Sequence, residues 1–166
     1  MKKQGSLFDG GGAFFSPCRT WRYVLWRVWD SRKARCVFIG LNPSTADETE
    51  DDPTIRRCVG FARRWGFGGI VMLNIFAFRA TDPRDLKKAE DPVGPQNDEI
   101  LWRYHDLKGL TVACWGSHGD FMRRGKKVAK LLVGMRCFGL TAAGHPKHPL
   151  YLRADSETVP FLGGAR

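Results

Sequence analysis

The sequence contains no run of 18 apolar residues, and its first residues, MKKQGSLFDGGG, lack the apolar core of a secretory signal peptide. We therefore expect neither a membrane span nor export, and predict a cytoplasmic protein. There is no Cys-x-x-Cys pair among the five cysteines, and four of them lie in apolar runs, namely Cys36, Cys58, Cys114 and Cys137. This pattern predicts reduced core residues rather than a disulfide framework. The sequence also has no internal repeat, so a solenoid or propeller is not expected.

The 166 residues suffice for one hydrophobic core, and 43% of them are hydrophobic. Such a core needs no metal or cofactor for stability, and we predict neither. We expect a mobile N-terminal segment over 1–20, a single domain over 21–162 and a tail over 163–166. Lys and Arg number 27 against 17 Asp and Glu, which gives a net charge of +10. This excess attracts polyanions, so nucleic acid, with DNA preferred, is the first partner to test. No obligate protein partner is evident.

Apolar runs and helical spacing alternate along the chain. Five short runs bounded by turn residues predict strands, and they cover 22–29, 35–42, 69–78, 110–116 and 135–142. Between them, helical spacing of apolar residues predicts helices over 53–66, 95–107 and 120–132, the first capped by Asp52. The alternation predicts an α/β fold, a three-layer α/β/α sandwich around a central, largely parallel sheet. In such folds, ligands bind at the carboxyl ends of the strands.

Two asparagines stand near strand ends. Asn42, in GLNPS at 40–44, is able to hold a water molecule, although it and Ser44 could instead only close a turn. Asn74 interrupts an apolar run and carries the donors and the acceptor needed to read the Watson–Crick edge of a pyrimidine. Backbone groups of a neighbouring loop would satisfy that amide equally well.

Further polar groups follow the later strands. The segment 141–153 carries His145 and His148 in two His-Pro pairs. Either histidine could donate to a developing oxyanion or lie on an ordinary surface loop, and the His-x-x-His spacing lacks a third metal ligand. An acidic run over 47–52 is compatible with a divalent cation, but a solvated loop with a helix cap is the preferred interpretation. A basic cluster beside Ser117 fits phosphate contact and a solvated helix face equally well, and it comprises Arg123, Arg124, Lys126, Lys127 and Lys130.

The order of GLNPS, then Leu-Asn followed by RATDP, then HPLYL resembles the motif order of the uracil-DNA glycosylase superfamily. This resemblance implies a uracil-DNA glycosylase-like fold, in which Asn42 orients water and Asn74 reads the flipped base. It implies further base contacts from Leu41 and Phe76, and it aligns the late His-Pro loop with His148, Pro149 and Leu152. Residues 41–98 resemble more closely a bacterial and phage family catalogued only as a domain of unknown function, through LNPSTAD, DDPTIRRC, NIFAFRATDP and PVGPQND.

The sequence departs from the glycosylase pattern at several positions. Leu150 replaces the serine that contacts a phosphate in the resembled enzymes, and Ser44 replaces a glycine or tyrosine. The four-cysteine cluster of some branches has no counterpart.

Three functional hypotheses follow from these residues. The first is a glycosylase that excises a damaged or modified base, most plausibly a pyrimidine, from DNA, with Asn42 and His148 as catalytic residues. The second is an enzyme acting on a free nucleotide or modified base, and the third is a non-catalytic nucleic-acid-binding module. The predicted nucleic-acid contacts are Ser44, Ser117, Arg123, Arg124, Lys126, Lys127 and Leu152.

Overall fold

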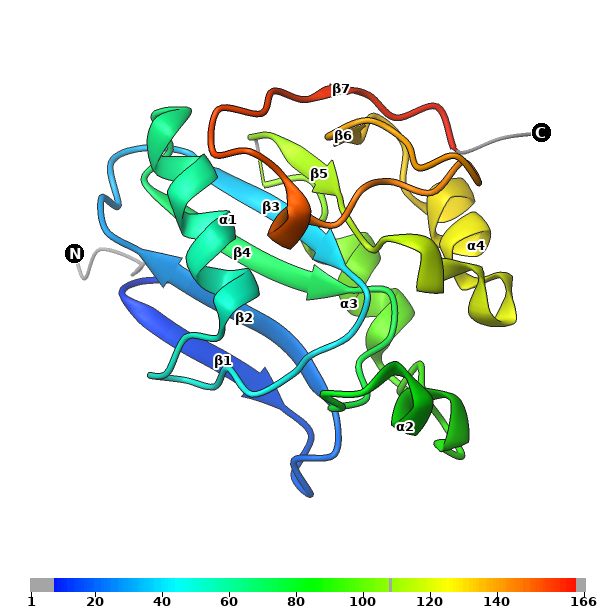
Figure 1. The fold of residues 1–166 in the computed structure, drawn as a ribbon. Helices are drawn as coiled ribbons and strands as arrows, with labels where there is room; N and C mark the ends of the chain where they lie inside the picture. The colour runs from blue at the N-terminus through cyan, green and yellow to red at the C-terminus, as the bar shows by residue number, and fades with distance from the viewer. Residues whose placement is uncertain (1–7, 108, 164–166) are drawn as a thin grey trace.

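The computed structural model describes residues 8–107 and 109–163. They form one seven-stranded sheet in the order β1-β2-β4-β3-β5-β6-β7, with helices on both faces (Figure 1). The strands are β1 (Gly11–Phe15), β2 (Arg22–Val28), β3 (Arg35–Gly40), β4 (Gly69–Asn74), β5 (Thr111–Ala113), β6 (Arg136–Cys137) and β7 (Val159–Pro160). The α-helices are α1 (Pro53–Arg64), α2 (Pro83–Lys88), α3 (Asn97–Tyr104) and α4 (Arg124–Leu131), and the 3₁₀ segments are η1 (Ser117–Arg123) and η2 (Pro149–Tyr151).

The centre of the sheet is parallel and its flanks are antiparallel. Strand β3 pairs in parallel with β4 on one side and with β5 on the other, and β5 pairs in parallel with β6. Strands β1 and β2 extend the sheet beyond β4 as an antiparallel ribbon, and β7 runs antiparallel to β6. The mixed α/β class with a parallel centre, and a strand within each of the five predicted runs, are therefore confirmed.

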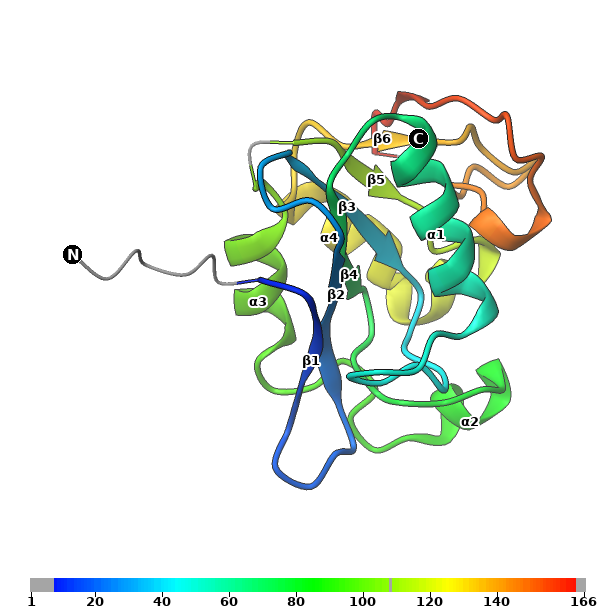
Figure 2. The ribbon, with the colours of Figure 1, turned by 90° about the vertical axis from the view of Figure 1, so that its left-hand side faces the viewer.

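Alternate residues of the central strands pack against helices on opposite faces. One apolar cluster joins Phe38 and Ile70 to the inner face of α1, and the other joins Ile39 and Val71 to α3 and α4. Figure 2 shows α1 and α3 on opposite sides of the sheet. Because each central strand is covered on both faces, its sequence is continuously apolar rather than alternating.

The segment that we expected to be mobile contains a strand. Residues Gly11–Phe15 form β1 and pair with β2, because Gly12 lets the indole of Trp26 lie directly against the backbone. A Cβ at Gly12 would lie 2.3 Å from Cζ2 of Trp26, so the absence of a side chain at this position permits the close packing of the two strands. The predictions for 1–7 and 164–166 lie outside the described residues.

The predicted helix over 120–132 is also divided differently. The chain turns at Met122 and Arg123, where φ is 55° and 54°, so the first part belongs to η1 and only Arg124–Leu131 is α-helical. Helix α2 and strand β7 are short elements that the apolar pattern does not predict. No helix among the described residues is long and apolar enough to cross a membrane.

The cysteines occupy the predicted places. Cys36, Cys58, Cys114 and Cys137 are buried and free, while Cys18 is exposed. Burial raises the pKa of the Cys114 thiol to about 12. These four cysteines are therefore neutral apolar side chains of the core.

Candidate functional site

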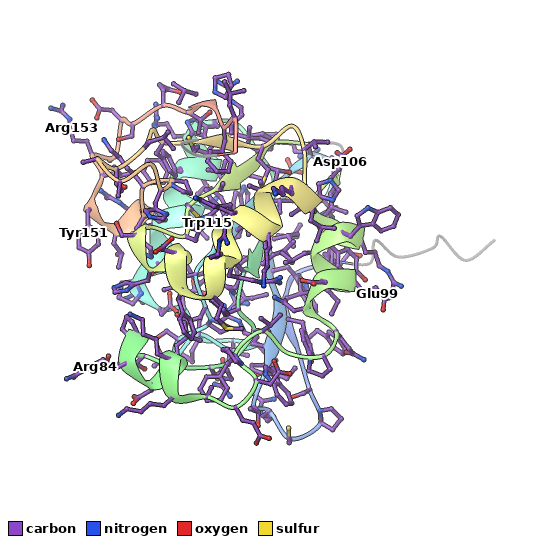
Figure 3. All side chains as sticks on the ribbon, turned by 90° about the vertical axis from the view of Figure 1, so that its right-hand side faces the viewer. Arg84, Glu99, Asp106, Trp115, Tyr151 and Arg153 are labelled. Carbon is purple, nitrogen blue, oxygen red and sulfur yellow. The ribbon has the colours of Figure 1, made fainter. Side chains whose placement is uncertain are left out.

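A cleft of about 860 Å³ opens at the carboxyl ends of β3, β4 and β5. The cleft is lined by groups from segments far apart in the chain, including Asn42, Asn74, Gly116 and His148. Its rim includes the N-terminus of α1 and the segment η2, which pack against each other. Figure 3 shows Tyr151 projecting outward from η2, whereas Trp115, which also lines the cleft, lies among other side chains. The expectation that the polar strand ends share one cleft is confirmed.

The end of β3 is shaped to admit the side chain of Asn74. Gly40 pairs with Asn74 across the parallel ladder, and a Cβ at Gly40 would lie 2.9 Å from Asn74 Oδ1 and 2.6 Å from Met72 Cε. These distances are shorter than a carbon atom normally tolerates, so a larger residue at position 40 would displace the ends of the Met72 and Asn74 side chains. The Gly40 of the GLNPS motif thus makes room for the amide of the neighbouring strand.

Asn74 carries a buried amide with no hydrogen-bond partner among the described residues. Its side chain is 2% exposed, and Nδ2 is buried without an acceptor. A buried polar group that lacks a partner costs about 1–3 kcal/mol, so most such groups are satisfied. No neighbouring loop of the described chain therefore satisfies this nitrogen, which is left without an acceptor in a residue that lines the cleft.

The backbone that carries Asn74 is held from the opposite side. Asn97 Nδ2 donates to the carbonyl oxygens of Asn74 and Ile75, at 3.0 and 3.1 Å. Arg124 Nε donates to the same Ile75 oxygen at 2.7 Å, and its guanidinium pairs with Asp98. Asn97 and Arg124 therefore position the end of β4 without lining the cleft.

Asn42 divides its two polar atoms between the fold and the cleft. Its Nδ2 donates to the carbonyl oxygens of Ala80 at 2.7 Å and Pro43 at 2.9 Å, and lies 3.4 Å from that of Phe78. No described residue donates a hydrogen bond to its Oδ1. The nitrogen therefore holds the turn, while the role of the oxygen in binding water stays a prediction.

His148 precedes η2 and lines the cleft with a defined tautomer. Its Nδ1 accepts from the backbone N–H of Leu150 at 3.3 Å, so the neutral ring carries its proton on Nε2. Burial lowers the pKa of His148 below its usual value, against the opposing effect of the carboxylate of Asp52. The ring is consequently a neutral Nε2–H donor at pH 7.

Three charged residues of the cleft, namely Arg22, Asp52 and Lys147, were not among the predicted site residues. Arg22, on β2, is 2% exposed and donates through Nη1 to the carbonyl oxygen of Ala46 at 2.8 Å. Asp52 caps α1 by accepting from the backbone N–H of Ile55 at 2.9 Å, and it also lines the cleft. The capping role of Asp52 was predicted, but the sequence gives no signal that its carboxylate also faces a cleft. Arg22 occupies an ordinary strand position, and only the tertiary fold buries it.

The remaining predicted residues fall into two groups. Leu41, Ser44, Ser117 and Leu152 line the cleft together with the residues described above, as does Leu150, the departure from the glycosylase pattern. The others lie outside it: Phe76 is fully buried and contacts Phe121, Arg124 is buried at the start of α4, and Arg123, Lys126 and Lys127 are exposed. The basic cluster therefore contains one structural arginine and an exposed part away from the cleft.

The acidic run over 47–52 is occupied by contacts within the chain. Glu48 pairs with Arg19 and Asp51 with Arg27, while Asp47 accepts from the backbone N–H of Glu50 at 2.8 Å. Within 8–107 and 109–163, no group of three His, Cys, Asp or Glu side chains is arranged to hold a metal ion. The carboxylates thus serve the loop and the helix cap.

Comparison with known proteins identifies the family of the chain. The family model described as Protein of unknown function (DUF1643) matches residues 22–150, which is more than half of the chain, and the chain therefore belongs to this family. No curated protein and no solved structure matches the chain significantly.

Proposed function

We propose that this member of the family hydrolyses the N-glycosidic bond of a nucleotide, with a damaged or modified base in DNA as its substrate and a uracil-DNA glycosylase-like fold as its scaffold. The observation that carries the proposal is the set of uncommitted polar groups in one cleft. They are Oδ1 of Asn42, the side-chain amide of Asn74 and Nε2 of His148. Together they supply a water acceptor, a reader for a base and a donor for a leaving group.

In this mechanism, Asn42 orients the attacking water. An amide oxygen accepts a hydrogen bond from water and directs its lone pair toward C1′ of the sugar. The C1′–N bond breaks with its electron pair moving to the base, water forms the new C1′–O bond, and the proton of the added water passes to solvent. Because an amide does not take up a proton, Asn42 acts by orientation alone.

His148 stabilises the negative charge that develops on the departing base. Its Nε2–H donates to a carbonyl oxygen of the base, and the neutral form suffices because the interaction is a hydrogen bond. Asn74 pairs with the edge of the base and sets which base is accepted. Neither step requires a metal ion.

A second candidate is hydrolysis of a free nucleotide. The observation that favours it is the position of the basic cluster, whose exposed residues lie outside the cleft and whose Arg124 is engaged with Asp98. A cleft of about 860 Å³ lies in the size range of small-molecule sites. The enzyme would then need no duplex to supply its substrate.

The test is a single-turnover assay with oligonucleotides that contain one uracil, hypoxanthine or modified pyrimidine, single- and double-stranded, with and without EDTA. Released base is detected by chromatography and abasic sites by alkaline cleavage, and deoxynucleoside 5′-monophosphates are assayed in parallel. We expect the wild-type protein to excise the base. The substitution Asn42→Ala should slow excision on the order of 10²-fold while changing the affinity for the substrate little. Asn74→Ala should chiefly alter which base is released.

A matched pair of histidine variants separates chemistry from general damage. His148→Ala, which removes the donor, should slow excision, whereas His105→Ala, at the end of α3 and away from the cleft, should not. Wild-type rates for both Asn42→Ala and His148→Ala would contradict the mechanism. Absence of base release from every oligonucleotide and mononucleotide would contradict the function itself.

A further inference from the structure

Arg22 is a buried cation in the cleft that forms no ion pair. Its side chain is among the largest that are fully buried, and no carboxylate of a described residue lies within 4.0 Å of it. Only Nη1 has a hydrogen-bond partner, the carbonyl oxygen of Ala46, while Nε is buried without one and Nη2 contacts no described acceptor. A buried guanidinium is costly unless its charge and its N–H groups are satisfied.

The charges around Arg22 do not remove this cost. Burial lowers its pKa to about 10, with Arg79 and Arg27 acting in the same direction and Asp52 and Asp47 opposing. Arg22 therefore stays protonated at pH 7. The carboxylate of Asp52 is directed at the N-terminus of α1, where it accepts from the backbone of Ile55.

Arg22 also lies beside the proposed water-binding turn. Its backbone N–H donates to the carbonyl oxygen of Ala77, and its Nη1 holds Ala46 in the loop that follows Asn42. Hydroxyl groups of Ser44 and Thr81, 3.5 Å apart, line the same cleft, as does the ammonium-bearing side chain of Lys147. An anionic group in the cleft would thus meet a guanidinium, hydroxyl donors and a second cation.

We propose that Arg22 is the phosphate-recognition residue of the cleft, taking a phosphate oxygen of the nucleotide whose base Asn74 contacts. Guanidinium N–H groups match phosphate oxygens in geometry and in charge. The inference rests on the proposed function for its choice of a nucleotide, but the phosphate subsite itself is tested without any base release. The phosphate is that of a free mononucleotide or a phosphodiester of a strand.

The experiment compares ligands that differ only in phosphate. Isothermal titration calorimetry measures the Kd of deoxyuridine 5′-monophosphate, deoxyuridine, inorganic phosphate and a single-stranded oligonucleotide with one deoxyuridine. We expect wild-type protein to prefer the nucleotide or the oligonucleotide over the nucleoside. Arg22→Gln should reduce that preference about 10- to 100-fold while leaving nucleoside affinity unchanged. If the affinity for the mononucleotide depends on Arg22, the natural ligand is a free nucleotide. If only the affinity for the oligonucleotide depends on Arg22, the ligand is a phosphodiester of a strand.

Two further variants keep the result interpretable. Arg136→Gln removes a half-buried arginine that donates to Thr158 outside the cleft, and should leave every Kd unchanged. Arg22→Met should keep or raise the melting temperature, because it replaces an uncompensated buried charge by an apolar side chain. A lower melting temperature, with nucleotide and nucleoside weakened equally, would mean that Arg22 only holds the Ala46 loop.

The outcomes separate this proposal from the glycosidase proposal. A phosphate preference that depends on Arg22, without base release from any substrate, refutes the hydrolysis and leaves the subsite. Base release with no phosphate preference, or failure of all the phosphate ligands to bind the wild type, refutes the subsite.

Discussion

Exchanging Asn42 for aspartate should destabilise the fold although the two side chains have nearly the same shape. Nδ2 of Asn42 donates to two carbonyl oxygens, of Ala80 at 2.7 Å and of Pro43 at 2.9 Å. A carboxylate has no N–H, so Asn42→Asp places a negatively charged oxygen against these two acceptors. Rotation of the side chain gives no remedy, because both carboxylate oxygens are acceptors.

The expected loss follows from these contacts. Each hydrogen bond contributes about 1 kcal/mol, and leaving partly buried carbonyl groups unpaired adds a penalty of about 1–3 kcal/mol. With two such bonds, we therefore expect the free energy of unfolding to fall by about 3–5 kcal/mol at pH 7. With a urea dependence of about 2 kcal/mol per molar, the midpoint of urea denaturation should fall by about 1.5–2.5 M.

The loss of stability in Asn42→Asp should become smaller as the pH is lowered. Facing two carbonyl oxygens, the new carboxyl group is favoured in its protonated form, so its pKa in the folded state is raised above the unfolded value of about 3.9. Folding then takes up a proton, and stability relative to wild type should recover as pH is lowered from 7 toward about 4. Asn42→Ala is the control, since it loses the same donors without the charge and should show no such recovery. Equal midpoints for wild type and Asn42→Asp at pH 7 would refute the assignment of Nδ2 to the fold.

Four further expectations concern other residues. Asn97→Ala removes two buried hydrogen bonds to the carbonyls at the end of β4, so urea denaturation should show a loss of about 2–3 kcal/mol. Since burial lowers the pKa of His148, the single-turnover rate of excision should be level at pH 7 and above. Below that lowered pKa the imidazolium keeps its Nε2–H and adds a positive charge beside the departing base, so the rate should rise on acidification, a limb that His148→Gln should abolish. Cys18 is exposed, and hydrogen bonds from Ser16 and Thr20 lower its pKa to about 7, so native protein at pH 7 should react with one equivalent of a thiol reagent, and more than one would show that the buried thiols open. Among the basic residues near α4, replacing the exposed ones, Arg123, Lys126 and Lys127, should flatten the salt dependence of oligonucleotide binding at unchanged stability, whereas Arg124→Gln should lower stability.

The central strands could be predicted because their sequence signal is local. Continuous apolar runs bounded by glycine and polar residues describe β3, β4 and β5, and parallel pairing then brings their carboxyl ends together. Asn42 and Asn74 could be assigned to a common cleft for this reason. The orientation of each amide could not be predicted, because it depends on carbonyl groups contributed by other segments.

The contacts of the charged residues could not be predicted, because they depend on the tertiary fold. Arg124 belongs to a basic cluster in sequence, but its partners are the carbonyl of Ile75 and the carboxylate of Asp98. Arg22 and Arg27 both lie on β2 among apolar residues of the sequence, yet Arg27 pairs with Asp51, whereas Arg22 has no carboxylate partner among the described residues. Such contacts join residues more than twenty positions apart, and helical or strand spacing carries no information about them.

The departure at Leu150 gains a physical meaning in this light. In the resembled glycosylases, a serine at this point of the late loop contacts phosphate, and here the position is a leucine that lines the cleft without any donor. A nucleotide bound with its base at Asn74 would then require phosphate donors from another segment. The cleft offers Arg22 from β2, whose Nε is buried without an acceptor in the described part of the chain, and Lys147 from the loop before His148. A phosphate donor on strand β2 would hold the phosphate deeper in the cleft than a donor on the late loop, and on a more rigid element. Such a site would favour a substrate whose phosphate can enter the cleft, such as a mononucleotide or the end of a strand.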